Sequence, residues 1–195
     1  MRQSLIMTVL FLLISSTNIH ASWLIYHKPE FKGKVVDMET NEPIEGAVVV
    51  AIYEKATHGP ADTVTSSFDA REALTDNKGE FRIPSYTTFI SPISTSYDVE
   101  FIIFKPGYVW ERPVHLESVF SGEGTRDFDM PMMWDKDLKI IVLKSGVVKL
   151  PKVKTNRDRI ESFSGSSDIY HFNKELPKAY EILHKENLYI KNLEY

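Results

Sequence analysis

Short apolar segments separated by polar turns run through residues 31–133. The segments 31–36, 47–53 and 97–104 are rich in β-branched and aromatic residues, which favours strands over helices. Segment 47–53 is apolar at nearly every position, which is typical of a strand that is covered on both faces. Segment 97–104 begins by alternating apolar and polar residues, as in a strand with one face toward water. The pattern predicts a mainly β protein, organised as a small antiparallel β-sandwich.

Turn-forming residues connect these predicted strands. Asp76-Asn-Lys-Gly79 predicts a hairpin turn, because Asp and Asn tolerate positive φ and Gly adopts it freely. Lys105-Pro-Gly-Tyr108 predicts a type II turn, since Pro and Gly fit its two central positions. Residues 54–71 and 84–96 are polar and contain Gly, Pro and many hydroxyl side chains, so we expect two long loops there.

Several shorter elements are expected after residue 108. Residues 109–114 suit an edge strand, because Pro113 could not donate to a neighbour in a central one. The run 128–133 suits a last sandwich strand, and 138–143 with 147–150 suits an extra hairpin. Thr155-Asn-Arg-Asp158 resembles a capping box that opens a short helix.

An amphipathic helix is expected over residues 173–193. We expect Asn173 to cap it, and Pro177 is tolerated in its first turn. Two interpretations are open: the apolar stripe packs on the sandwich, which we favour, or it docks on a partner. The stripe consists of Leu176, Ala179, Tyr180, Leu183, Ile190 and Leu193.

The first 21 residues have the layout of a secretory signal peptide. Arg2 precedes an apolar run from Leu5 to Ile14, and Ala21 offers a small residue for cleavage. Ile19 is larger than is usual near a cleavage site, so an uncleaved anchor is the alternative. The run is short compared with the ~20 residues of a membrane-spanning helix. We therefore expect cleavage and no membrane span afterwards.

The chain has no cysteine, which excludes disulfides and a lipid-modified N-terminal cysteine. An exported protein without disulfides is commoner in bacterial envelopes than in animal secretions. We therefore expect a bacterial periplasmic or extracellular location. Loss of residues 1–21 removes Arg2 and no acidic residue, so the net charge changes from −4 to −5. This acidic balance argues against nucleic-acid binding.

Four phrases in order resemble the carboxypeptidase regulatory-like domain: Gly33-Lys-Val-Val-Asp37, Pro43-Ile-Glu-Gly-Ala-Val-Val49, Thr75-Asp-Asn-Lys-Gly-Glu-Phe-Arg-Ile83 and Lys105-Pro-Gly-Tyr108. The resemblance covers residues 30–132 and implies a transthyretin-like sandwich of about seven antiparallel strands. It also implies an appendage without catalytic residues of its own. Relatives of this kind accompany peptidases, outer-membrane receptors or surface proteins, and related sandwiches bind sugars.

Three segments are therefore expected: a signal peptide at 1–21, the sandwich at 30–132, and a C-terminal extension at 133–195. Within the sandwich, four residues at turns are expected to build the fold and to take no part in catalysis. They are Asp37, Asp76, Gly79 and Gly107.

The histidines show no metal-binding pattern. Neither His-Glu-x-x-His nor His-x-His occurs, so we predict no metal ligands and no cofactor. No Gly-x-Ser-x-Gly phrase or phosphate-binding glycine pattern occurs either, and we predict no catalytic residue. The histidines after the signal peptide are His27, His58, His115, His171 and His184.

Two acidic pairs, Asp127/Asp129 and Asp135/Asp137, have the alternate spacing that places both side chains on one face of a strand. Such oxygen ligands could hold calcium. We favour solvated charges that keep an edge strand from aggregating.

Four aromatic residues near predicted loops or strand ends are the candidate binding residues: Trp110, Trp134, Tyr86 and Phe89. Exposed rings stack on sugars or anchor a protein partner. The alternative, which we favour, is that they close the ends of the core.

Three functions stay open. The one we favour is a monomeric, non-enzymatic module with a structural or binding role in the bacterial envelope, bound to an unknown envelope protein or glycan. The second is a carbohydrate-binding module that uses exposed aromatic residues. The third is an enzyme whose site no motif reveals.

Overall fold

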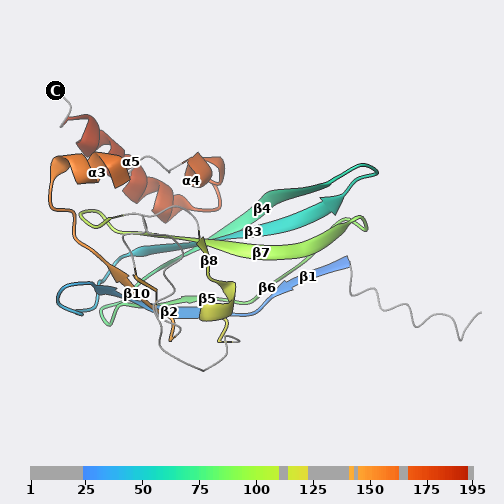
Figure 1. The fold of residues 1–195 in the computed structure, drawn as a ribbon, viewed down its shortest axis with the longest axis horizontal. Coiled ribbons are helices and arrows are strands. Elements are labelled where there is room, and N and C mark those ends of the chain that lie inside the picture. The colour runs from blue at the N-terminus through green and yellow to red at the C-terminus, as the bar shows by residue number, and fades with distance from the viewer. Residues whose placement is uncertain (1–23, 110–113, 123–140, 143–144, 163–166, 193–195) are drawn as a thin grey trace, which may run out of the picture.

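The computed structural model of the chain describes residues 24–109, 114–122, 141–142, 145–162 and 167–192. Two layers of β-strands lie face to face, and helices cover the outer face of one layer (Figure 1). The expected mainly β fold, with antiparallel sheets and a C-terminal helix, is confirmed.

The helix-covered sheet has the strand order β4-β3-β7-β8, and all of its pairs are antiparallel. The expected loop at 54–71 is wrong, because β3 and β4 form one long hairpin. Its turn closes where the Gly59 amide donates to the Asp62 carbonyl, 2.7 Å away. The outer half of β4 is exposed at every position from Thr63 to Ser67, so it lacks the apolar alternation of a half-buried strand. The strands are β3 (Val48–His58), β4 (Thr63–Leu74), β7 (Ser94–Phe104) and β8 (Val114–His115).

The opposite layer consists of the sheet β5-β2-β10-β9 and a two-stranded ribbon, β1-β6. Ile25 pairs with Phe89 in the ribbon, and Phe31 pairs with Ile83 in the sheet. The pairing of β1 with β6 therefore continues the register of the pairing of β2 with β5. The gap between them contains Pro29 and Pro84, and a proline cannot donate a ladder hydrogen bond. The strands are β1 (Ile25–Lys28), β2 (Phe31–Asp37), β5 (Glu80–Ile83), β6 (Tyr86–Phe89), β9 (Ile141–Val142) and β10 (Val147–Leu150).

The second expected loop, at 84–96, is also wrong, since it contains β6 and the start of β7. The extra hairpin is confirmed by the antiparallel pairing of β9 with β10. Strand β10 also pairs with β2, in parallel, from Val147 opposite Lys34 to Leu150 opposite Asp37. The segment expected to be an extension therefore supplies strands to the sheet. The expected strand at 128–133 lies outside the described residues.

The turn at Asp76–Gly79 forms, but the predicted hairpin does not. Asp76 Oδ1 accepts the amides of Lys78 and Glu80 at 2.8 and 2.9 Å, and Gly79 has φ +75°. The strands on either side nevertheless belong to different layers, because β4 pairs with β3 and β5 pairs with β2. The turn thus connects the two β-layers of the sandwich.

The predicted turn at Lys105–Tyr108 is confirmed. The Tyr108 amide donates to the Lys105 carbonyl at 3.0 Å, and Gly107 has φ +84°. This is the hydrogen bond and the backbone conformation of a type II turn.

Two cores share strand β3. Val49, Ala51 and Tyr53 point into the core between the β-layers. Val48, Val50 and Ile52 point into a second core beneath the C-terminal helices. The expected covering of this strand on both faces is confirmed.

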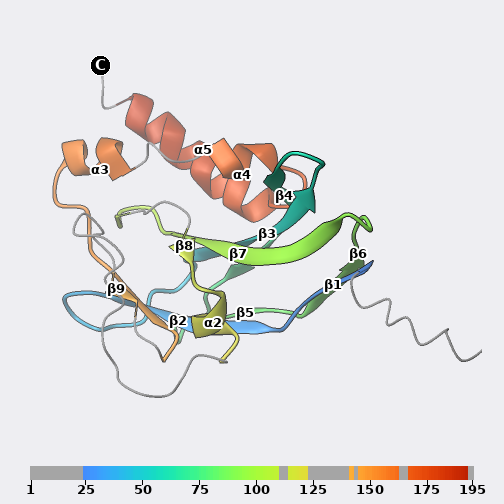
Figure 2. The same ribbon diagram turned by 45° about the vertical axis from the view of Figure 1, so that its right-hand side comes forward.

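The C-terminal helix packs on the sandwich, which is the interpretation that the sequence favoured. Its stripe residues Leu176, Ala179, Leu183 and Ile190 are buried, and the first three join the second core. Figures 1 and 2 show the helices on the side of the sheet away from the opposite layer. Those helices are α3 (Asn156–Ser162), α4 (Ser167–His171) and α5 (Pro177–Lys191); a short α2 (Glu117–Phe120) follows β8.

The two predicted helix caps have different outcomes. At α3 the capping box is confirmed: the Asp158 amide donates to Thr155 Oγ1, and the Thr155 amide to Asp158 Oδ2, both at 3.1 Å. At α5 the prediction of Asn173 is wrong. The N-cap is Leu176, whose side chain cannot accept a hydrogen bond.

A carboxylate from β4 caps α5 instead. Glu72 accepts the amides of Lys178 and Ala179 at 3.0 and 2.7 Å. It satisfies two amides that have no partner within the helix, and its negative charge is favourable at a helix N-terminus. The contact ties the helix to the sheet across 106 residues of sequence.

We expect Gly79→Ala to destabilise the fold by at least about 3 kcal/mol. Positive φ is unfavourable for Ala, and a Cβ here would overlap the Val35 carbonyl oxygen. Gly107→Ala is the matched control, because its φ is also positive but no atom lies within 4 Å of the added Cβ. It should lose only about 1 kcal/mol in urea unfolding. Equal losses in the two variants would contradict the steric argument.

We expect Glu72→Gln to lower the unfolding free energy by about 1 kcal/mol, because a charged cap is replaced by a neutral one. Glu175→Gln removes the same charge just before α5 without touching the cap, and it should change stability by less than about 0.5 kcal/mol. Urea unfolding followed by circular dichroism measures both. An equal effect of the two substitutions would mean that net charge, not the cap, sets the stability.

Candidate functional site

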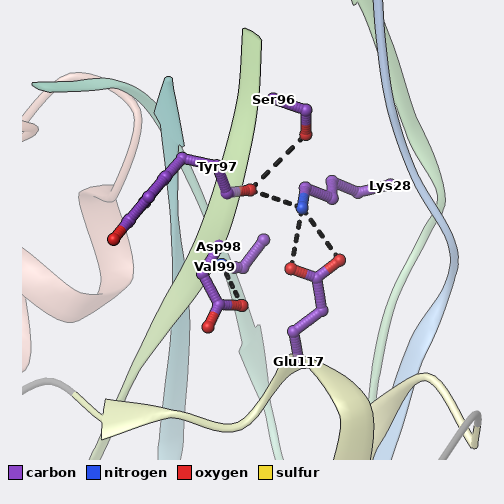
Figure 3. A network of polar contacts seen from close by, with 6 residues as sticks. All are labelled: Lys28, Ser96, Tyr97, Asp98, Val99 and Glu117. Atoms are coloured by element: carbon purple, nitrogen blue, oxygen red, sulfur yellow. Dashed lines mark hydrogen bonds and ion pairs between the residues drawn. The ribbon is translucent and has the colours of Figure 1, made fainter. Parts of the chain in front are cut away.

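Lys28 is a buried cation at the end of β1. It is 6% exposed, and its side chain reaches from β1 toward β7 and α2 (Figure 3). Nζ contacts the Tyr97 carbonyl oxygen at 2.6 Å and the Glu117 carboxylate at 2.9 Å (Oε1) and 2.7 Å (Oε2). Three contacts match the three N–H donors of an ammonium group, so this buried charge is fully hydrogen-bonded.

Glu117 begins α2, and its side chain is 22% exposed. Burial is the main cause that raises the pKa of Glu117; a hydrogen bond with Asp98 raises it further, and Lys28 opposes both. Asp98 also accepts the Val99 amide at 2.9 Å. A lysine and two carboxyl groups, from β1, β7 and α2, therefore form one polar cluster, which we call the Lys28 cluster.

Aromatic rings adjoin the Lys28 cluster on the inner face of β1. Tyr26 meets Tyr53, Phe68 and Tyr86 edge to face, with ring centroids 6.1, 4.9 and 6.0 Å apart. Lys28 Nζ lies 5.5 Å from the Tyr26 ring centroid, which gives the cation a favourable ring face.

The hydroxyl groups of Tyr26 and Tyr53 are buried without a hydrogen-bond partner. Burial raises the pKa of both tyrosines above the ordinary range, and the Glu117 charge adds to this at Tyr26. Both hydroxyls thus stay neutral, in an interior of low polarity.

The aromatic candidates do not meet on one surface. Tyr86 is 9% exposed and belongs to the core, with the Arg71 guanidinium 4.4 Å from its ring centroid. Phe89 is 82% exposed and lies opposite Ile25 on the outer face of the ribbon. Trp110 and Trp134 lie outside the described residues.

Next to Phe89, the outer ribbon face carries polar groups. His27 and Thr87 are a cross-strand pair, and His27 Nδ1 lies 2.8 Å from Thr87 Oγ1. The outer ribbon face, defined as Ile25, His27, Thr87 and Phe89, thus combines an exposed apolar pair with hydrogen-bonding side chains. The sequence analysis did not predict this surface. It predicted neither β1 nor β6, and only their pairing places Phe89 beside Ile25.

Asp37 is a structural residue, at the end of β2. It is 2% exposed, and its Oδ1 accepts the amides of Glu39 (2.9 Å) and Thr40 (3.0 Å). Its Oδ2 accepts the Tyr108 hydroxyl (3.1 Å) and lies 3.0 Å from Lys152 Nζ. Burial alone would raise the pKa of Asp37, but these hydrogen bonds outweigh it and hold the pKa well below its usual range.

An open hollow of about 800 Å³ lies on the sheet β5-β2-β10-β9, and both signs of charge line it. Lys32 and Arg82 on its rim share the carboxylate of Glu30. Lys34, Asp76 and Glu80 complete its charged lining. The mixture favours no single class of charged ligand.

The histidine side chains whose surroundings are described contact other groups, as His27 contacts Thr87. His58 lies within hydrogen-bonding distance of Thr63 and Thr95, His171 packs on Phe172, and His184 stacks on Tyr180. His115 forms part of β8. Within the described ranges no three His, Asp or Glu side chains converge as a metal site. The pairs Asp127/Asp129 and Asp135/Asp137 lie outside those ranges.

No family model matches the chain, and no curated protein or solved structure is significantly similar to it. The resemblance to the carboxypeptidase regulatory-like domain therefore stays a prediction. In the part of the chain that the structure describes, no helix is both long and apolar enough to cross a bilayer.

We expect Tyr26→Phe to raise the unfolding free energy by up to about 1 kcal/mol, because it removes a buried hydroxyl that makes no hydrogen bond. Tyr108→Phe is the matched control. It deletes the hydroxyl that donates to Asp37 and should lower the stability by about 1 kcal/mol. Urea unfolding measures both variants, and equal losses would contradict the assignment of the Tyr26 hydroxyl as unpaired.

Proposed function

We propose that the chain is a non-enzymatic β-sandwich module with a structural or binding role in the bacterial envelope. Its secretory layout and lack of cysteine support the location, and the four family-like phrases support an appendage rather than an enzyme. The observation that carries the binding role is the outer ribbon face, where Phe89 is 82% exposed beside Ile25.

The internal use of charged groups supports a module of this kind. Lys28 with Glu117 joins β1 to α2, and Glu72 joins β4 to α5. Arg159 with Glu186 joins α3 to α5 through two hydrogen bonds, one of them 2.8 Å long. Each of these groups joins elements of the fold.

The outer ribbon face suits a protein partner better than a sugar. An exposed aromatic ring beside an aliphatic side chain is typical of a protein contact with a polar rim. A sugar platform needs several aromatic rings in one plane, and the neighbouring candidate Tyr86 points into the core. Carbohydrate binding is the second candidate; Phe89 with the His27 and Thr87 side chains favours it.

Phe89→Ala tests the binding role. Because Phe89 is so exposed, its removal should change stability by less than about 0.5 kcal/mol. We expect the variant to lose a partner that the wild type retains from solubilised envelope extract. Leu188→Ala, which truncates an exposed apolar residue of α5, is the control and should retain the partner.

Two further measurements separate the alternatives. Binding of a defined sugar on a glycan array, abolished by Phe89→Ala, would favour the carbohydrate-binding module over a protein partner. Turnover of a peptide or glycoside by the purified protein would contradict the non-enzymatic proposal.

A further inference from the structure

The Lys28 cluster places an amine directly against a carboxyl group. Lys28 Nζ lies 2.7 and 2.9 Å from the two Glu117 oxygens, and the two side chains are 8% and 22% exposed. The residues are 89 positions apart in the sequence, so the folded strands and α2 bring them together. Figure 3 shows the two groups facing one another between β1 and α2.

Amide formation between a lysine and a carboxyl group needs such an arrangement. In water the two ions are solvated and rarely meet, whereas a folded interior holds them in contact and excludes bulk water. The site also needs a group that moves a proton between the nitrogen and the departing oxygen. Asp98 is the group of the cluster that can do this, since its carboxyl group lies beside Glu117 (Figure 3) and interacts with it strongly enough to raise its pKa.

We propose that Lys28 and Glu117 condense into an intramolecular amide, which joins β1 covalently to α2. The bond between Nζ and the Glu117 Cδ forms, and one C–O bond of the carboxyl group breaks. The oxygen leaves as water with two of the three ammonium protons, so no oxidant, reductant or other reactant is needed. The remaining N–H keeps the hydrogen bond to the Tyr97 carbonyl.

The surroundings of the pair assist this reaction. The two nearly equal contacts are those of an ion pair. A turn about the last torsion of Glu117 moves the two oxygens aside and turns the face of the carboxyl group toward Nζ. That torsion is broad and roughly two-fold in glutamate, so the turn is easy. Burial, which raises the pKa of Glu117, favours the neutral acid, the form that accepts an amine. The adjoining Tyr26 ring keeps the site apolar.

The consequence is a covalent staple in a chain that has no cysteine. Like a disulfide, the amide would close a long loop and restrict the unfolded chain. It would also fix β1, and with it the outer ribbon face, to the rest of the sandwich. This inference does not depend on what the ribbon face binds.

The mass of the purified full chain tests the proposal. With the N-terminus identified from its terminal peptide, the wild type should be lighter than its sequence by one water molecule. Tandem mass spectrometry should find the peptides that contain Lys28 and Glu117 joined. A natively folded wild type with the full sequence mass would overturn the proposal and leave an ordinary ion pair.

Variants assign the reaction to these residues. Lys28→Arg keeps the positive charge and Glu117→Ala removes the acceptor, and each should restore the full mass. Lys149→Arg makes the same exchange on β10 and should keep the deficit. Circular dichroism verifies that each variant folds. A deficit that persists in folded Lys28→Arg would overturn the assignment.

Asp98→Ala tests the proton transfer separately. It leaves both reacting groups in place, so the linked fraction should fall while the folded fraction does not. Full linkage in Asp98→Ala would overturn the role of Asp98, without affecting the linkage itself.

Discussion

The burial of both faces of strand β3 is the requirement on which the rest of the structure depends. Its residues 48–53 are apolar on both faces, so each face needs its own cover. The opposite β-layer covers one face and the C-terminal helices cover the other. Strands β4 and β7 satisfy its backbone groups on either side. The order of layers, from helix to sheet to second β-layer, follows from this single strand.

Features that depend on neighbouring residues could be predicted from the sequence. The turn at Lys105–Tyr108 and the capping box at Thr155 each involve residues at most four positions apart, whose side-chain chemistry determines the local backbone. The buried stripe of α5 follows from helical spacing alone. These predictions succeeded because the local conformation depends on residues that are close in the sequence, and contacts with distant residues did not change it.

Pairing partners could not be predicted in the same way. The residues of the turn at Asp76–Gly79 are the same whether the strands on either side pair with each other or belong to different layers. Here β5 pairs with β2, from Phe31 opposite Ile83 to Lys34 opposite Glu80, and not with β4. The exposed half of β4 is a strand because β3 lies beside it, not because of a hydrophobic pattern. The Glu72 cap and the Lys28 contact with Glu117 join residues 106 and 89 positions apart, which no local motif encodes.

The alternation of β1 explains why its end is chemically unusual. Tyr26 and Lys28 both point inward, so one strand face places an apolar ring and a cation in the same interior. The apolar surroundings strengthen the attraction between Lys28 and Glu117, and they also make an unpaired charge costly. A buried charge of this kind persists only if its partner is held firmly in place. Here α2 begins at Glu117 itself, and Phe120 of the same helix is anchored against Phe81 and Phe101 in the core. The packing of α2 that stabilises this buried ion pair also holds the Lys28 amine against the Glu117 carboxyl group, which is the arrangement that the proposed amide formation requires.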